Sequence, residues 1–152
     1  MMLNLNDPSL LETRAYVNGQ WIENGATFPV HNPANGGKLA DVTDLDVKDV
    51  SLAINGAYDV QRTWAAKTGK ERGAILRKWH DLMLDNIDDL AAILTAEMGK
   101  PLAEAKGEIM YGASYIEWFA EEAKRIYGDV IPGHQPDKRI VVLKQPVGVV
   151  GS

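Results

Sequence analysis

Hydrophobic and polar positions follow two different periods along the chain and divide it into strand and helix regions. Residues 1–45 hold short β-prone runs separated by turn residues. The run AYVNGQWI surrounds Asn18-Gly19, a pair that favours a two-residue hairpin turn because both turn positions need positive φ. The run FPVHNPANGGKLADVT contains a second break at residues 32–37, rich in Asn, Pro and Gly. The pattern therefore predicts two β hairpins.

Apolar residues in the next region recur every three or four positions, the spacing of helices with one buried face. Four helices are predicted between residues 46 and 128. The first is capped by Asp46, the second begins with the capping box Thr68-x-x-Glu71, the third stops at Gly99, and the fourth runs from Pro101 to Gly128. The four tryptophans, most of them on or beside these apolar stripes, are expected in the core: Trp21, Trp64, Trp79 and Trp118.

The last region returns to strand. The segment DVIPGHQPD is predicted as a polar turn, and RIVVLKQPVGVV as two β-prone runs separated by Pro146. The valine-rich run from Val147 is typical of a buried parallel strand, which needs neighbouring strands on both sides. The order of strands, four helices and strands is α+β when the chain is taken alone.

Composition narrows the class of protein. A length of 152 residues with 45% hydrophobic content is enough for a globular domain with a core. A net charge of −5 argues against nucleic-acid binding, because phosphates attract basic surfaces. No apolar run approaches the roughly 20 residues of a membrane span, and the start MMLNLNDPSLLETR has no secretory signal pattern. The sequence has no cysteine, which removes disulfides and thiol chemistry and fits a cytoplasmic protein.

Candidate catalytic residues are sparse. His31 lies near a predicted turn, His80 on a helix and His134 in a loop, and none has a metal-ligand partner at a suitable spacing. The histidines are therefore expected to be structural or solvent-facing. The terminal GVVGS has two glycines after a predicted strand, too little for a dinucleotide fingerprint.

The acidic residues near the end of the fourth predicted helix leave two interpretations open. Glu117, Glu121 and Glu122 are either paired carboxylates for catalysis or a solvated helix face above packed Trp118 and Phe119.

Glu97 ends the third predicted helix, where the helix dipole disfavours an acid that has no partner. Its partner is either a bound cation or the nearby Lys100.

Five segments occur in a fixed order: YVNGQWI, NPANGGKLADV, TGKERGAILRKWHDLMLDNIDDLAAILTAEMGKPLAEAKGEI, SYIEWFAEEAKRIYGDVIPGH and KQPVGVVGS. Together they resemble the N-terminal portion of NAD(P)-dependent aldehyde dehydrogenases, and most of all the succinate-semialdehyde branch. The resemblance runs from about Arg14 to Ser152, and its ordered spacing makes it specific to the superfamily.

The resemblance implies an α/β aldehyde dehydrogenase fold of which this chain is an N-terminal fragment. The implied parts are N-terminal β hairpins at 1–45, the helical part of the cofactor-binding domain at 46–128, a strand of the oligomerisation element at 129–146, and the truncated start of a Rossmann-type sheet at 147–152. In the family a Pro-Trp-Asn motif, the catalytic Cys, the general-base Glu, the cofactor-binding residues and the substrate-carboxylate arginines come later. No position here matches them, so no catalytic or cofactor-binding residue is assigned.

Within the chain the resemblance implies three sites. The fourth helix borders the substrate tunnel, with candidates Gly107, Tyr111, Ser114 and Trp118. Val30 and His31, with Glu97, resemble a monovalent-cation site. Residues 139–147 resemble the element that pairs subunits into a homo-oligomer, through the strands Arg139–Leu143 and Lys144–Val147.

The function implied for the whole enzyme is NAD- or NADP-dependent oxidation of an aldehyde, with succinate semialdehyde as the expected substrate. The chain alone is expected to be inactive and to bind the cofactor poorly. The alternative is a noncatalytic oligomerisation or interaction module derived from the family. Neither a nucleic acid nor a membrane is expected as a partner.

Overall fold

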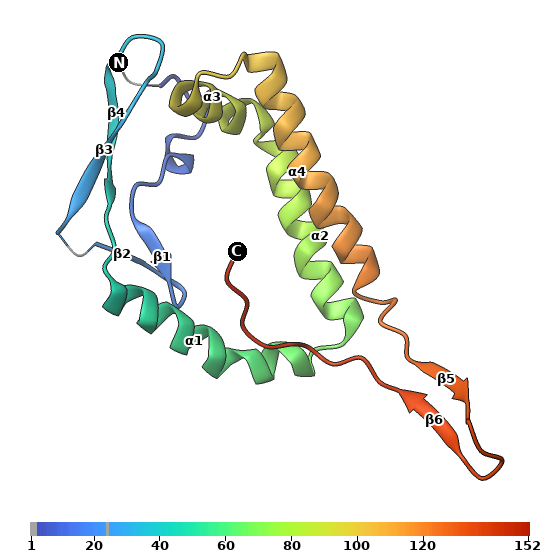
Figure 1. The fold of residues 1–152 in the computed structure, drawn as a ribbon. Helices are drawn as coiled ribbons and strands as arrows, with labels where there is room; N and C mark the ends of the chain where they lie inside the picture. The colour runs from blue at the N-terminus through green and yellow to red at the C-terminus, as the bar shows by residue number, and fades with distance from the viewer. Residues whose placement is uncertain (1–2, 24) are drawn as a thin grey trace.

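The structure, a computed structural model, describes residues 3–23 and 25–152. Its helices and strands follow the order strands, helices, strands (Figure 1). In chain order they are η1 (Pro8–Leu10), β1 (Ala15–Val17), β2 (Gln20–Ile22), β3 (Thr27–His31), β4 (Lys38–Thr43), α1 (Val47–Ala66), α2 (Gly69–Asp85), α3 (Ile87–Met98), α4 (Leu102–Glu122), β5 (Asp129–Pro132) and β6 (Arg139–Val142).

Both predicted N-terminal hairpins are confirmed. β1 and β2 pair antiparallel through Asn18 (φ 52°) and Gly19 (φ 80°), the positive dihedrals that this two-residue turn requires. β3 and β4 pair antiparallel, with a register irregularity between Val30 and His31. The strands of the described chain form three separate two-stranded sheets, the third being β5 with β6.

The predicted helix caps at Asp46 and Thr68 are confirmed. The Asp46 carboxylate accepts the backbone N–H of Asp49, whose own side chain accepts the backbone N–H of Asp46. Thr68 and Glu71 make the same reciprocal pair at the start of α2. Because these side chains satisfy N–H groups that have no partner within the helix, they fix where α1 and α2 begin.

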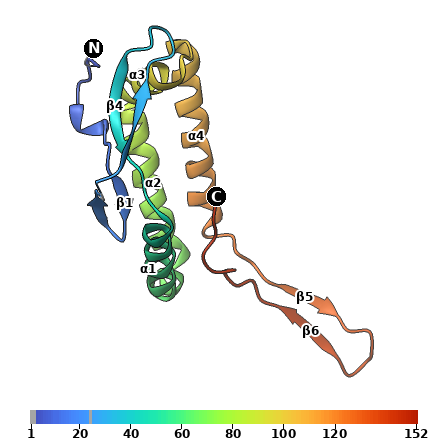
Figure 2. The ribbon, with the colours of Figure 1, turned by 60° about the vertical axis from the view of Figure 1, so that its left-hand side comes forward.

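The helices pack through small residues. α2 and α4 run side by side in both views, and α3 packs across one end of α4 (Figures 1 and 2). Small residues let the α2 and α4 backbones approach closely near Gly73 and Ala120, while larger side chains such as Met83 and Arg77 of α2 reach α4 further along the seam. The hydrophobic residues buried in the described chain are all alanines: Ala91, Ala96, Ala105, Ala113 and Ala120.

The expectation that the tryptophans form the core is wrong. Their exposed fractions range from 40% for Trp64 to 64% for Trp118. Trp64, Trp79 and Trp118 do lie on helices, but on faces that are exposed rather than buried against the rest of the described chain.

The C-terminal region differs from the prediction in three ways. α4 ends at Glu122 rather than running to Gly128, and irregular turns follow it. The segment DVIP, predicted as a turn, is the strand β5, which pairs with β6 from Asp129 opposite Val142 to Pro132 opposite Arg139. No strand is present in residues 143–152, so the expected run Lys144–Val147 and a strand from Val147 do not form. A strand exists only when it is paired, and nothing in the described chain pairs with these valines.

The β5–β6 hairpin extends away from the helices in both views (Figures 1 and 2). Its apolar side chains are largely exposed, including Val130 (78%) and Val141 (62%). Among the described residues, no helix has the length and apolar character needed to cross a membrane.

Asp89 ties the N-terminal segment to α3. This buried carboxylate accepts the backbone N–H groups of Asn6 (3.0 Å) and Asp7 (2.8 Å), and also the Asn6 side-chain amide (3.0 Å). The hydrogen bonds from the two backbone N–H groups lower the pKa of Asp89, because they stabilise its charged form.

Candidate functional site

A hollow of about 690 Å³ opens along the C-terminal half of α4. Spacings of three and four residues place Tyr111, Ser114 and Trp118 on one face of the helix. The hollow is lined by Tyr111, Ser114, Tyr115, Glu117, Trp118, Phe119 and Glu121. It therefore brings together three of the four predicted tunnel residues. Gly107, the fourth, is not among the lining residues. The role of all four residues in a substrate tunnel stays a prediction.

The aromatic wall of the hollow contains a tyrosine pair. The hydroxyl groups of Tyr111 and Tyr115 are hydrogen-bonded at 2.6 Å, and their rings meet edge to face with centroids 5.0 Å apart. The hydrogen bond to Tyr111 raises the pKa of Tyr115, because it favours the neutral phenol. Ser114 donates its hydroxyl proton to the Tyr111 carbonyl at 2.7 Å, which leaves the Ser114 oxygen able to accept a hydrogen bond.

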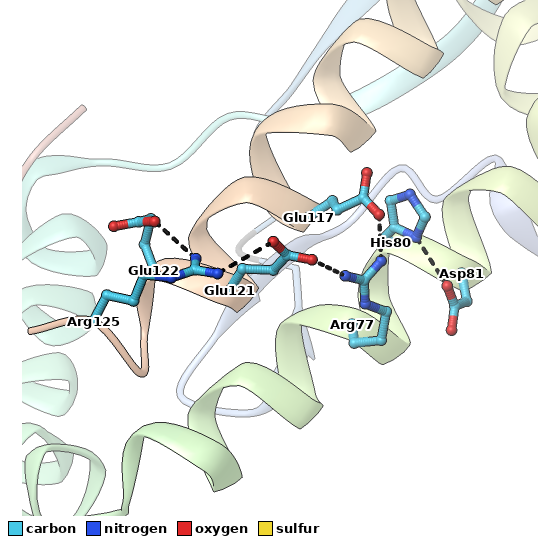
Figure 3. A network of polar contacts seen from close by, with 7 residues as sticks. All are labelled: Arg77, His80, Asp81, Glu117, Glu121, Glu122 and Arg125. Atoms are coloured by element: carbon cyan, nitrogen blue, oxygen red, sulfur yellow. Dashed lines mark hydrogen bonds and ion pairs between the residues drawn. The ribbon is translucent and has the colours of Figure 1, made fainter.

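An arginine on α2 joins the acidic part of the hollow to the neighbouring helix (Figure 3). Arg77 Nη1 lies 2.6 Å from Glu117 Oε1, and Arg77 Nη2 lies 3.3 Å from Glu121 Oε1. The ion pair lowers the pKa of Glu117 and raises the pKa of Arg77, mainly through their shared hydrogen bond. Two carboxylates that line the hollow are thus held by one guanidinium from α2.

The network continues along α4 to the end of the helix. Arg125 Nη1 lies 2.9 Å from Glu122 Oε1, and Arg125 Nη2 lies 3.9 Å from Glu121 Oε2. Two guanidinium groups therefore face three carboxylates. The paired-acid interpretation of this segment is weakened, because each of these carboxylates is held in an ion pair. The alternative, a solvated helix face above packed aromatic residues, is right about the acids. It is wrong about the aromatic residues, since Trp118 and Phe119 are exposed.

Arg77 and Tyr115 are the residues of this region that sequence reasoning missed. A signal for Arg77 was present in the sequence. It follows Gly73 by four positions, on the face of α2 that meets α4. Glu117 and Glu121 form a like-charge pair at i,i+4, which calls for a nearby cation.

The histidines occupy separate places, as predicted. His31 is exposed on β3 and His134 is exposed in the β5–β6 connection. His80 is mostly enclosed, with its Nδ1 atom 2.8 Å from Asp81 Oδ1. Across residues 3–23 and 25–152, no three His, Cys, Asp or Glu side chains gather as a metal-binding group.

The predicted cation site at Val30, His31 and Glu97 has one supporting feature. The end of α3 approaches the loop after β3, since a Cβ on Gly99 would lie 3.0 Å from Pro33 Cγ. Glu97 itself is exposed, Val30 is half-buried and His31 is exposed. The site stays a prediction.

The alternative partner for Glu97 is engaged elsewhere. The ammonium group of Lys100 forms an ion pair with Glu108 on α4. This ion pair links the first turns of α4 to the loop that precedes the helix.

Residues 147–152 do not present a dinucleotide cradle. Such a cradle needs a paired strand that leads through glycines into a helix. Here Gly148 (φ 108°) and its neighbours form exposed, unpaired backbone. The glycines of this segment therefore do not form the strand–turn–helix arrangement of a dinucleotide site.

Comparison with known proteins gives a consistent result. The profile of the aldehyde dehydrogenase family matches residues 21–152. The chain is 54% identical over 152 residues to a glutarate-semialdehyde dehydrogenase of Pseudomonas putida and 53% identical to the succinate-semialdehyde dehydrogenase [NADP(+)] GabD of Escherichia coli, covering 99% of this chain and 32% of each relative.

A crystal structure of an aldehyde dehydrogenase from Brucella melitensis biovar abortus superposes with a TM-score of 0.93 at 54% identity, covering 96% of this chain and 31% of that one. The chain spans about a third of the length of the curated relatives that it matches, and corresponds to their N-terminal portion.

Proposed function

The chain belongs to the aldehyde dehydrogenase family, and on that premise we propose that it is the N-terminal part of an enzyme that oxidises a short semialdehyde to the carboxylate with NAD or NADP. The expected substrate is succinate semialdehyde, with glutarate semialdehyde as the longer alternative. The observation that carries the proposal is identity above 50% across the whole chain to relatives named for these two substrates.

The chain's contribution to such an enzyme is structural and substrate-facing. α4 offers an aromatic hollow with Tyr111, Ser114 and Trp118 on its wall, which supports the predicted tunnel border. The oligomerisation role assigned to residues 139–147 is supported by β6, whose outer edge is open for pairing with a second subunit. We place the enzyme in the cytoplasm, and fractionation of cells that express it tests this compartment.

The 152 residues are proposed to be inactive without a further segment. Oxidation in this family is implied to begin with thiolate attack on the aldehyde carbon, and the sequence contains no cysteine. Residues 147–152 also form no cofactor cradle. Without a nucleophile and a cofactor site, the hollow can bind or orient an aldehyde but has no group that takes part in its oxidation.

Complementation in trans tests this proposal. The purified chain is assayed with succinate or glutarate semialdehyde and either NAD or NADP, first alone and then after co-expression with the part of the Escherichia coli relative that the chain does not match. We expect no reduced cofactor above a protein-free control in the first assay and turnover in the second. Turnover by the chain alone would refute the assigned role, as would failure of a correctly assembled complex to act on either semialdehyde.

A noncatalytic interaction module is the second candidate function. It is favoured by the exposed β5–β6 hairpin, which projects from the helices and presents unpaired strand edges (Figure 2). Native mass spectrometry of the chain mixed with the Escherichia coli relative separates the two candidates. Stable mixed oligomers with no gain of activity support the module.

A further inference from the structure

The hollow on α4 combines aromatic walls with two carboxylates, and an arginine that does not line the hollow forms ion pairs with both. Glu117 and Glu121 both line it, one helical turn apart. Arg77 is not among the lining residues; it lies on α2 and contacts both carboxylates (Figure 3). Its side chain is 38% exposed, and those of Glu117 and Glu121 are 46% and 51% exposed.

This arrangement bears directly on the charge of the ligand. The relatives' names specify succinate and glutarate semialdehydes, which both carry a carboxylate at neutral pH. Two uncompensated glutamates on the wall of the hollow would repel such an anion and would have little effect on a neutral aldehyde of the same length. The net charge of −5 adds to the repulsion.

We propose that Arg77 is a specificity-determining positioning residue that offsets the charge of Glu117 and Glu121 and so admits a short aldehyde bearing a carboxylate to the hollow. The inference rests on the proposed function, since it takes the hollow as the substrate-facing surface. Arg77 acts through the two glutamates rather than by touching the ligand. Arg125 assists at Glu121 but divides its contacts with Glu122.

The ion pair also fixes where the carboxylates point. Arg77 holds Glu117 at 2.6 Å and Glu121 at 3.3 Å, so both lining carboxylates are tied to α2. Loss of the guanidinium makes the local charge more negative and removes the contacts that hold the two lining carboxylates in place.

The test uses the 152-residue chain and two unreactive four-carbon probes, the anion 4-hydroxybutyrate and the neutral 1,4-butanediol. Binding is followed by NMR at the indole N–H of Trp118, on the wall of the hollow. In Arg77→Gln we expect the affinity for 4-hydroxybutyrate to fall about fivefold, the scale of an exposed ion pair. The affinity for 1,4-butanediol is expected to stay the same, and added salt should shrink the difference.

Two further variants separate charge compensation from simple structural support. Arg77→Lys keeps the positive charge and should retain most of the binding of the anion. The triple variant R77Q/E117Q/E121Q removes the arginine together with both acids and should restore it. Far-UV circular dichroism confirms that each variant is folded.

The proposal is overturned if Arg77→Gln weakens both probes equally, if the triple variant fails to recover binding, or if the unmodified chain binds neither probe. Each of these results concerns the hollow alone. Failure of the proposed function appears separately, as absence of turnover in the complementation assay, so the two outcomes are distinguishable.

Discussion

Gly73 of α2 lies against the carbonyl oxygen of Ala120 in α4, so closely that a Cβ at position 73 would meet that oxygen at 2.5 Å. Both residues are buried. The contact explains why small residues occupy positions 73 and 120, because the two helix backbones leave no room there for a larger side chain.

Replacing Gly73 by Ala should therefore destabilise the chain. The added methyl group meets backbone, which cannot turn aside, so α2 and α4 must separate at a cost of about 1–3 kcal/mol. Chemical denaturation measures the change. Gly107→Ala is the matched control, because a Cβ there meets nothing within 4 Å. That variant should gain about 0.5–1 kcal/mol from improved helix propensity. Equal effects at the two positions would contradict the close seam.

Asp89→Asn should release the N-terminal segment from α3. The amide keeps the size of the carboxylate but loses the charge that accepts the N–H groups of Asn6 and Asp7. We expect faster hydrogen exchange at these two amides and a lower melting temperature. Asp88→Asn is the matched control. Asp88 is exposed and pairs with Lys106 at 2.5 Å, so its loss should leave both amides protected.

The effect of Asp89 should depend on pH with a definite sign. Its folded pKa is lowered, so its contribution to stability is complete above the pKa of an unfolded aspartate, about 3.9, and is lost as pH falls through the folded value. The stability difference between the unmodified chain and Asp89→Asn should therefore be constant near neutral pH and vanish in strong acid. A difference that grew as the pH fell would contradict this assignment.

Thr68→Ala should weaken the start of α2. The threonine hydroxyl accepts the Glu71 N–H at 3.2 Å, and the substitution leaves that N–H without its cap. The expected loss is about 1 kcal/mol in the free energy of unfolding. Thr63→Ala serves as control, because Thr63 lies within α1 and bonds only the carbonyl of Val60. It should be neutral or slightly stabilising. Thermal unfolding of the two variants in parallel makes the comparison.

The elements that the sequence predicted well are those fixed by neighbouring residues. The Asn18-Gly19 turn and the caps at Asp46 and Thr68 depend on the chemistry of a few adjacent positions, and the structure reproduces each of them. Gly99 likewise ends α3 in the left-handed conformation (φ 77°) that glycine favours.

The failures concern relations between distant residues. DVIP forms the strand β5 only because β6 pairs with it, and the four residues themselves do not indicate which segment will be their partner. The apolar periodicity of α2 and α4 predicted buried faces. Helical periodicity does not reveal that the close seam uses Gly73 and the alanines instead of Trp79 and Trp118.

The candidate site was half predicted for the same reason. Tyr111, Ser114 and Trp118 share a face of one helix, and helical spacing alone brings them together. The charge of the hollow depends on Arg77, which is 40 residues away from Glu117 in sequence. Helical spacing cannot supply a contact between two helices, although the Glu117–Glu121 repetition shows that a cation is needed.

The β5–β6 hairpin should make the chain self-associate. Val130 and Val141 pair across the hairpin and are 78% and 62% exposed, on a two-stranded sheet with unpaired edges. Burial of such a surface against a second copy is favourable, and open strand edges can extend into a shared sheet. Sedimentation velocity over a range of protein concentrations should show a concentration-dependent increase in mass.

The double variant Val130→Thr/Val141→Thr keeps the β-branched shape and should weaken this self-association about tenfold, since ~1.4 kcal/mol of lost apolar burial corresponds to a factor of ten in the dissociation constant. Leu82→Thr, on the exposed face of α2, is the control for association through the helices and should leave the hairpin contact intact. If Leu82→Thr disrupts the oligomer while the hairpin variant leaves it unchanged, the helices carry the association, and the role assigned to residues 139–147 is wrong.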